Sequence, residues 1–325
     1  MTKLSEIPLV VIGGPTAVGK TQLSIELAKR FNGEIINGDR LQLYRGLDIG
    51  TGKATVEERQ GIPHYLLDTL DWHENYDASQ FKAEATQLIQ AIWAKGKLPI
   101  LVGGSGLYLE GLLYHLEFGG EGSQADDMRQ LLQQRLVQEG AEVLWQELAT
   151  QDPDAAAKIP VQNERRIVRA LEMMALTGKK FSEQVRHEQQ QSVFHECLLV
   201  LNRPRQALYE RINQRVELMI AQGLEQEVRA LYDGVQTLDL NQIQSTQGIG
   251  YKEWFPYFAG EDITQQQVME AIQQNSRRYA KRQLTWFRNR TRQAHWLDAT
   301  DFDQAVAHAS AQVQLLLQDL ARKEG

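Results

Sequence analysis

The sequence GPTAVGKT decides the fold of this chain. It consists of residues Gly14, Pro15, Thr16, Ala17, Val18, Gly19, Lys20 and Thr21. It fits the pattern G-x-x-x-x-G-K-[ST], in which backbone N–H groups and a helix N-terminus surround a phosphate group. The apolar stretch Ile7 to Ile12 precedes it, and TQLSIELAKRF, with apolar residues at helical spacing, follows it. This order predicts a strand, a phosphate-binding loop and a helix.

Two side chains of the loop carry chemistry in this pattern. Lys20 is expected to approach the phosphate oxygens, and the hydroxyl of Thr21 is expected to ligate Mg²⁺. The alternative is a glycine turn with an incidental lysine, but a chance match in a chain of this length arises only about once in a hundred. The loop alone leaves three ligands open: a nucleotide that is hydrolysed, a nucleotide that phosphorylates an acceptor, or another diphosphate ester.

Further strands and helices alternate along the first part of the chain. Strands are predicted at Glu34 to Asn37, in LPILVGG (98–104) and in ECLLVLNRP (196–204), and SQFKAEATQLIQAIWAKGK (79–97) predicts a helix. Parallel strands joined by right-handed crossovers follow from this alternation, and their ligands bind beyond the carboxyl ends of the strands. The fold class is therefore α/β, with a parallel sheet flanked by helices.

The pattern changes after about residue 118. The polar stretch GGEGSQADD leads into some seventy residues of helical pattern, so we predict an all-helical insertion over 118–196 between core segments 1–117 and 197–325. The rest is expected to be largely helical. Its apolar stripe is typical of core packing, and it consists of Leu208, Ile212, Val216, Met219 and Leu224.

Composition narrows the function. With 42% hydrophobic residues the chain can bury a large core, and its net charge of −7 argues against indiscriminate coating of nucleic acid. The segment Ala271 to Leu297 differs, since it has no acidic residue. Its cations favour a phosphate-binding surface over a solvated helix face, and they are Arg277, Arg278, Lys281, Arg282, Arg288, Arg290 and Arg292.

No apolar stretch predicts a membrane span or a signal peptide, so we expect a cytoplasmic protein. The single cysteine, Cys197, is expected to be a buried thiol.

Asp39 is the first acidic residue beyond the second predicted strand, near the place where the loop would hold a reacting phosphate. A carboxylate there could remove a proton from an acceptor or bind Mg²⁺ through water, although an aspartate after a strand is often a turn or cap residue. A nucleotide hydrolase would usually show a second apolar strand that ends in aspartate. LPILVGGSG ends in glycines and serine instead, and Asp68 in HYLLD is a weak substitute.

Seven motifs in order identify a family. They are GPTAVGKT, GDRLQLYRGLDIGTGK, IPHYLLD, LVGGSGLY, RRIVRALE, GIGYKE and YAKRQLTWFRN, and they span nearly the whole chain. Together they closely resemble the bacterial tRNA dimethylallyltransferases, or tRNA isopentenyltransferases. The resemblance implies transfer of a dimethylallyl group from dimethylallyl diphosphate to the N6 amine of adenosine at tRNA position 37, with diphosphate as the leaving group. It also implies a P-loop kinase-like core whose channel admits the allylic substrate at one mouth and the flipped adenine at the other.

The same resemblance implies roles for individual residues. Thr16 to Thr21 would hold the diphosphate, Asp39 would act as general base, and Lys20 with Mg²⁺ would stabilise the departing charge. Ser105, where the family commonly has threonine, would present its hydroxyl to the target nucleotide. The remaining matches are to tRNA-contacting segments: Asp39, Arg40, Leu41 and Gln42; Arg129; and Arg165, Arg166, Ile167, Val168 and Arg169.

Some alternatives remain open from the sequence. Arg166 and Arg169 could instead pair with Glu172 on one helix, and Arg40 stands where the family usually has serine. A small-molecule kinase would share the loop, an adenylate isopentenyltransferase would alkylate a free nucleotide, and a noncatalytic RNA-binding protein would need neither activity. The expected partners are the tRNA anticodon loop and dimethylallyl diphosphate, bound by a monomer.

Overall fold

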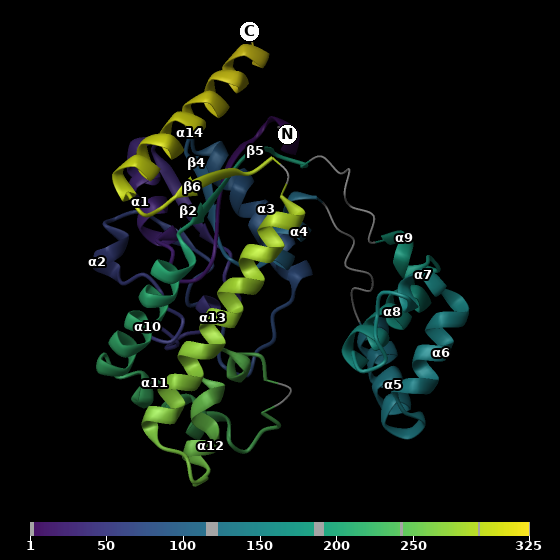
Figure 1. The fold of residues 1–325 in the computed structure, drawn as a ribbon. Helices are drawn as coiled ribbons and strands as arrows, with labels where there is room; N and C mark the ends of the chain where they lie inside the picture. The colour runs from purple at the N-terminus through teal and green to yellow at the C-terminus, as the bar shows by residue number, and fades with distance from the viewer. Residues whose placement is uncertain (1–2, 115–122, 185–191, 241–242, 292, 325) are drawn as a thin grey trace. The chain divides into compact units, whose positions relative to one another are not determined.

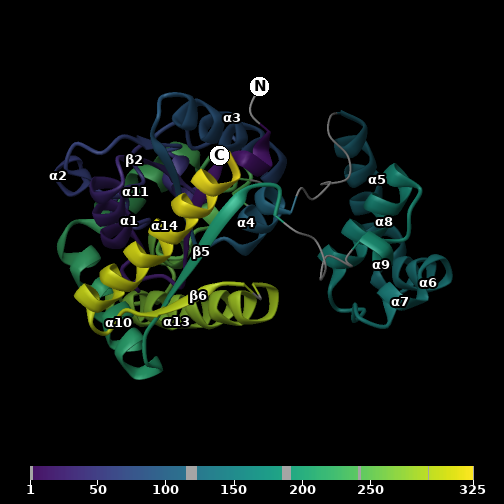
Figure 2. The same cartoon turned by 90° about the horizontal axis from the view of Figure 1, so that it is seen from above.

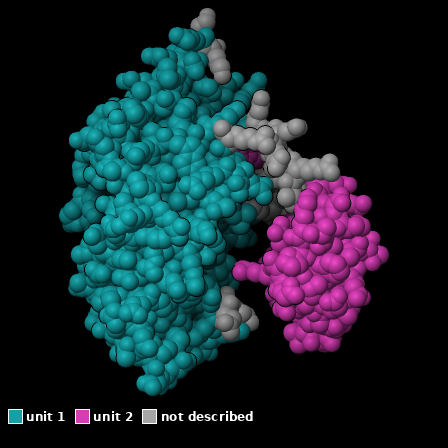
Figure 3. Space-filling view, in the orientation of Figure 1, with its two compact units in different colours: residues 1–113, 192–325 teal, residues 114–191 magenta. Residues whose placement is uncertain are grey.

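The computed structural model describes residues 3–114, 123–184, 192–240, 243–291 and 293–324. They form two compact units, coloured separately in Figure 3. Unit 1 comprises Met1–Leu113 and Ser192–Gly325, and unit 2 comprises Tyr114–Gln191, which shares most of its residues with the insertion predicted over 118–196. The chain leaves and re-enters unit 1 at one place, where the Val193 N–H donates to the Leu113 carbonyl over 2.8 Å.

A six-stranded sheet forms the centre of unit 1, in the order β3-β2-β4-β1-β5-β6, and every neighbouring pair is parallel (Figure 1). The strands are β1 (Pro8–Gly13), β2 (Gly33–Asn37), β3 (His64–Tyr65), β4 (Leu98–Val102), β5 (His195–Asn202) and β6 (His295–Asp298). The chain passes from β1 to one side of the sheet and later to the other, so β1 and β4 flank the switch point where ligands of such sheets bind.

The predicted parallel sheet is confirmed, but two of its strands were not predicted. β1 and β2 are buried along their whole length, and for β1 this explains why the strand reads as a continuous apolar run. β3 has two half-buried residues, and three of the four side chains of β6 are exposed. Neither edge strand carries an apolar run, and β6 lies in the part of the chain that was expected to be helical.

Nine α-helices belong to the described part of unit 1. They are α1 (Lys20–Arg30), α2 (Val56–Arg59), α3 (Ala78–Ala94), α4 (Gly106–Leu113), α10 (Arg205–Ala221), α11 (Leu224–Val235), α12 (Phe255–Phe258), α13 (Gln265–Arg290) and α14 (Phe302–Glu324). α1 and α14 pack against each other and share a core with β1 through Val10 and Ile12. Leu9 and Val11, which alternate with them along β1, point to the opposite face of the sheet. On that face α3 packs on β2 and β4, and Figure 2 shows α3 beside β2.

A second core joins α10, α11 and α13 to the loop after β2, around Tyr44, Tyr251 and Trp254. The Glu227 carboxylate on α11 holds this loop. It accepts hydrogen bonds from the backbone N–H groups of Asp48, Ile49 and Gly50 at 2.8, 2.8 and 2.9 Å, and from the Tyr251 hydroxyl at 2.6 Å. Burial and the Glu227 charge raise the pKa of Tyr251, so its hydroxyl stays a donor.

Unit 2 is helical over its described residues and has its own apolar core. Its helices are α5 (Ser123–Glu139), α6 (Ala141–Gln151), α7 (Pro153–Ala156), α8 (Glu164–Thr177) and α9 (Phe181–Gln184). Leu144 and Leu148 of α6 are fully buried against Ile167 of α8. The buried Asp152 carboxylate caps α7 through Ala155 N–H and accepts two hydrogen bonds from Ser182, which ties α9 to the bundle.

Two smaller expectations concern the whole described chain. Cys197 is buried in β5, as predicted. Among the helices of the described segments, none combines the length and the apolar composition that a membrane crossing requires.

Replacing Glu227 with alanine should destabilise unit 1. Three backbone N–H groups and one hydroxyl lose their acceptor, and we expect the free energy of unfolding to fall by about 1–3 kcal/mol. Urea or thermal unfolding measures this change. Glu225→Ala is the matched control, because Glu225 lies on the same helix and bonds a single exposed glutamine side chain, Gln265. Equal stability of the two variants would contradict the anchoring role of Glu227.

Candidate active site

The predicted phosphate-binding loop connects β1 to the first turn of α1. Gly14 and Gly19 have φ angles of 138° and 112°, which only glycine adopts readily. A Cβ at Gly14 would lie 2.7 Å from the Leu201 carbonyl oxygen, so this strand end also requires close backbone approach. Ala17 has a φ of 62°, which turns the peptide in the middle of the loop. The loop therefore ends at a helix N-terminus whose N–H groups can receive an anion.

Lys20 folds back over this loop. Its Nζ donates to the carbonyl oxygens of Gly14 at 3.0 Å and Pro15 at 2.8 Å. Burial lowers the pKa of Lys20 to about 8, while the nearby Asp39 charge opposes the shift and the Arg215 charge adds to it. A buried ammonium without a carboxylate in contact is stabilised by an arriving anion.

Asp39 follows β2 and caps the short 3-10 helix η2 (Arg40–Leu43), because its Oδ1 accepts from the Leu41 N–H at 3.1 Å. The buried Asn37 fixes the backbone on both sides of it. Asn37 Oδ1 accepts from the Asp39 N–H at 3.0 Å, and Asn37 Nδ2 donates to the carbonyls of Asp39 and Leu66 at 2.8 Å each. The cap interpretation and a chemical role are compatible, since the cap uses one carboxylate oxygen.

Two cavities meet beside Asp39. The larger, about 870 Å³, is lined by the phosphate-binding loop, and the smaller, about 450 Å³, is lined by Ser105. Seven residues line both cavities: Thr16, Ala17, Asp39, Thr51, Arg215, Met219 and Tyr279. The predicted loop, carboxylate and hydroxyl are thus brought together at the carboxyl edge of the sheet.

Arg215 was not predicted, yet it lies at this junction. Its Nη1 donates to Thr16 Oγ1 at 3.3 Å and its Nη2 to the Thr51 carbonyl at 3.4 Å. Desolvation lowers the pKa of Arg215, and the Asp39 charge opposes that effect. A Cβ at Gly52 would collide with this guanidinium, so the glycine gives it room. One feature of the sequence could have predicted Arg215. It is a cation that lies between Ile212 and Met219, on the side of α10 that carries the apolar stripe.

The first predicted tRNA segment divides between the cavities. Arg40 and Leu41 line the smaller one, and Arg40 Nη1 donates to Gln244 Oε1 at 3.4 Å. Gln42 lines the larger one, and its amide donates to the Thr51 carbonyl at 3.3 Å. The smaller cavity is also lined by Gln247 and by Gly248 to Gly250, which begin the motif GIGYKE.

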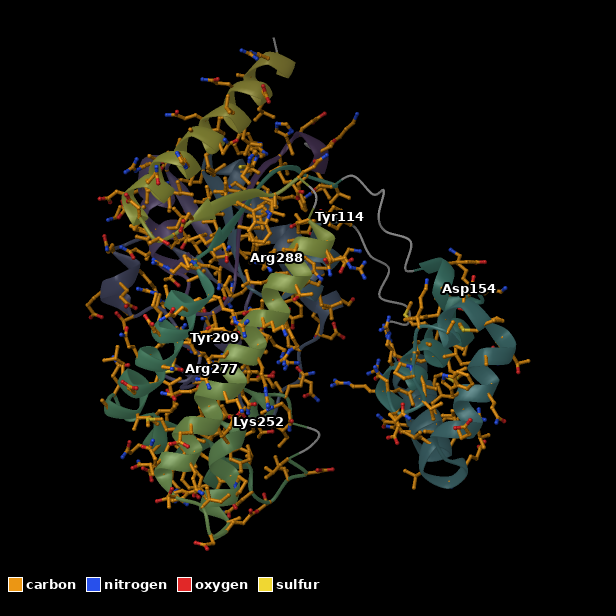
Figure 4. The ribbon with its side chains drawn as sticks, in the orientation of Figure 1. Tyr114, Asp154, Tyr209, Lys252, Arg277 and Arg288 are labelled. Carbon is orange, nitrogen blue, oxygen red and sulfur yellow. The ribbon has the colours of Figure 1, made fainter. Side chains whose placement is uncertain are left out.

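Helix α13 carries the basic segment. Its exposed cations are Arg278, Lys281, Arg282, Arg288 and Arg290, of which Arg288 is labelled in Figure 4 together with the less exposed Arg277. Arg277 donates to Asn213 of α10 at 2.6 Å, and Arg290 pairs with Glu110 of α4 at 3.3 Å. Three other side chains of the helix pack on glycines near the strand ends: Phe287 on Gly13, Gln283 on Gly104 and Trp286 on Gly106, where a Cβ would collide with each side chain. Arg292 lies outside the described residues.

The second predicted tRNA segment lies in unit 2. Arg165 and Arg166 are exposed, whereas Ile167 and Val168 are buried, so the side chains that can meet RNA in this stretch are the arginines. Arg169 and Arg129 both contact the buried Glu172 carboxylate, at 2.9 and 2.7 Å. The pairing considered for Arg169 is therefore present.

Comparison with known proteins identifies a family to which this chain is similar. The model of the IPP transferase family matches residues 42–290. The tRNA dimethylallyltransferase of Geobacillus thermodenitrificans is 47% identical over 293 residues, which cover 90% of this chain and 91% of that protein. The tRNA dimethylallyltransferase of Bacillus subtilis is 45% identical with the same coverage.

Solved structures give the same result for the fold. The full-length tRNA isopentenylpyrophosphate transferase of Bacillus halodurans matches with a TM-score of 0.73 and 40% identity, and the match covers 98% of this chain and 99% of the other. A eukaryotic dimethylallyltransferase acting on tRNA matches with a TM-score of 0.81 and 32% identity, covering 97% of this chain and 80% of the other.

The lowered pKa of Lys20 predicts a pH-dependent anion site. The ammonium is charged below about pH 8 and is lost as pH rises through that value, so affinity for inorganic diphosphate should fall about tenfold between pH 7 and pH 9 relative to a permanently charged site. Calorimetric titration at several pH values measures it. Lys20→Arg keeps its charge and is the reference, because diphosphate itself gains negative charge over this range. Parallel pH profiles for the two proteins would refute the prediction.

Proposed function

The chain belongs to the IPP transferase family, and we propose that it is a tRNA dimethylallyltransferase. It transfers a dimethylallyl group from dimethylallyl diphosphate to the N6 amine of adenosine at tRNA position 37 and releases diphosphate. The observation that carries this proposal is the junction of the two cavities, where Asp39 and Thr16 face both. An alkyl transfer between a diphosphate ester and a nucleobase needs such a junction, because the two substrates must meet at one carbon.

On the acceptor side, Asp39 takes the proton. The lone pair of an aromatic amine is delocalised into its ring, so the amine is a poor nucleophile. A positioned carboxylate that accepts the N6 proton as the carbon–nitrogen bond forms lowers the barrier. The backbone clamp by Asn37 and the cap to Leu41 hold Asp39 in one orientation. Ser105 lines the smaller cavity, which we call the acceptor cavity, and its hydroxyl can form a hydrogen bond with the same amine.

On the leaving-group side, the carbon–oxygen bond breaks and its electron pair goes to the diphosphate. Lys20, Arg215 and the N-terminus of α1 stabilise that growing charge, because they surround the larger cavity. The donor set fits Mg²⁺ in the way such ions bind diphosphates, through a hydroxyl, phosphate oxygens and water. Thr21 lines the cavity and would be the hydroxyl ligand, and the ion would neutralise charge on the leaving group.

The tRNA is proposed to bind through two cationic regions of the described chain. One is the exposed face of α13, whose Arg282 also lines the acceptor cavity. The other is in unit 2, where Arg165 and Arg166 are exposed and Arg129 and Arg169 are partly so. Arg40, Leu41 and Gln42 are proposed to contact the anticodon loop near the target base. We propose that the protein acts as a monomer, and we propose the cytoplasm, where tRNA is found, as its location.

A small-molecule kinase is less well supported by the site. Val102 ends β4, and glycines and Ser105 follow it without an aspartate. Asp68, the substitute considered for that role, instead contacts the buried Lys53 ammonium at 2.6 Å and Arg59 at 3.8 Å, and it lines neither cavity. Lys53 is also held by Asp48 at 2.6 Å, so this cluster stabilises the loop after β2.

Labelled dimethylallyl diphosphate and Mg²⁺, incubated with the protein and with either tRNA carrying adenosine at position 37 or free AMP, test the proposal. Label should reach tRNA alone. Asp39→Asn keeps the helix cap but not the base, so we expect kcat to fall about 10²- to 10⁴-fold with little change in KM. Asp77→Asn is the control, because Asp77 caps α3 outside both cavities.

Three outcomes would overturn parts of this reading. Transfer to AMP alone would indicate an adenylate isopentenyltransferase. Phosphorylation of an acceptor by ATP without consumption of allylic diphosphate would indicate a kinase. Undiminished transfer by Asp39→Asn would remove the general-base role.

A further inference from the structure

Gln283 bridges the two loops that the proposed reaction must align. Its side chain is 6% exposed, and its amide makes two hydrogen bonds to backbone groups. Gln283 Oε1 accepts from the Thr16 N–H in the phosphate-binding loop at 3.0 Å, and Gln283 Nε2 donates to the Gly104 carbonyl, next to Ser105, at 3.0 Å. One planar group therefore spans the distance between the diphosphate loop and the loop of the acceptor cavity.

The chemistry of this bridge is specific to an amide. Its two partners are an N–H and a carbonyl, so the bridging group must accept on one side and donate on the other. An ionised glutamate could accept from Thr16 but could not donate to Gly104. The close approach also requires Gly104, because a Cβ there would collide with Nε2.

The neighbouring contacts keep the bridge from drifting. On the same side of α13, Trp286 packs on Gly106 and the ring of Phe287 would lie 2.5 Å from a Cβ at Gly13. These two glycines flank the two bridged loops, since Gly13 precedes the phosphate-binding loop and Gly106 follows Ser105. The helix thus holds the amide in one place relative to both loops.

Resting on the function proposed above, we propose that Gln283 is a positioning residue that sets the separation between bound allylic diphosphate and the attacking amine. It lines the larger cavity, but both polar atoms of its amide are bonded to the two loops, so it acts through these loops and not on the reacting atoms. It fixes Thr16, which lines both cavities, relative to Ser105 of the acceptor cavity. Displacements of about 1 Å in such an alignment can cost two orders of magnitude in rate. Because the exposed Lys281 and Arg282 belong to the same helix, tRNA bound there is aligned by the same element.

Gln283→Met tests the proposal by removing both hydrogen bonds at similar volume. We expect the single-turnover rate with both substrates bound to fall about 10- to 100-fold. The dissociation constants of dimethylallyl diphosphate and tRNA, each measured alone by calorimetry, should change less than about threefold, because each loop keeps its own binding groups. Rates are measured well below the unfolding temperature of each variant.

Gln283→Glu adds a pH readout that a purely structural role would not move. The ionised carboxylate repels the Gly104 carbonyl, whereas the protonated acid can donate to it, and burial raises the pKa of such a carboxyl. The ratio of variant to wild-type kcat should therefore rise as the pH is lowered from 8 to 6. Gln273→Met is the matched control, since Gln273 lies on the same helix, donates to the Asn213 carbonyl and to Glu217 of α10, and lines neither cavity.

The outcomes separate this proposal from the function on which it rests. Failure of the wild-type protein to prenylate tRNA would refute the function. An active wild-type protein with an unchanged single-turnover rate in Gln283→Met, or with a flat pH ratio in Gln283→Glu, would refute the positioning role. An equal loss of rate in Gln273→Met would also refute it, because the effect would then be general damage to α13.

Discussion

The close packing of helix α13 on three glycines holds the candidate site together. Three side chains of α13 occupy the space that a Cβ would take at Gly13, Gly104 and Gly106. These glycines stand at the carboxyl ends of β1 and β4, the two central strands, while α13 comes from the last fifth of the chain. The loops near the N-terminus therefore reach their working arrangement only when a segment more than 170 residues away has docked.

Electrostatics around the larger cavity are set for an anion. Lys20 and Arg215 are largely removed from water, and the charge that favours both is that of Asp39. The lining of the cavity also includes Glu26, Asp48 and Glu58, but beside the loop two desolvated cations stand near the single carboxylate of Asp39, and holding them there costs stability while no anion is bound. In the proposed function, a bound diphosphate would offset that cost and place the reactive carbon next to the carboxylate. The same groups would then stabilise the charge that the leaving group acquires.

The sequence predicted the parts of this molecule that follow from local pattern. The apolar runs of β1, β4 and β5 could be recognised because both faces of an inner parallel strand are buried, and the loop 14–21 could be recognised because its glycines and lysine have fixed spacing. β3 and β6 were missed since edge strands need no apolar run. Arg215 was missed because its stripe reads as core, and only the tertiary fold turns that stripe toward Thr16.

The point where unit 2 joins the core has a different consequence. Leu113 and Val193 are hydrogen-bonded to each other, so the two ends of the inserted segment leave unit 1 side by side. The segment between these two residues adds little strain to the sheet. Its length can therefore change without altering the register of β1 with β5. The sheet and both cavities thus belong to unit 1 alone, and the sequence of the inserted unit can change without altering the residues that line them.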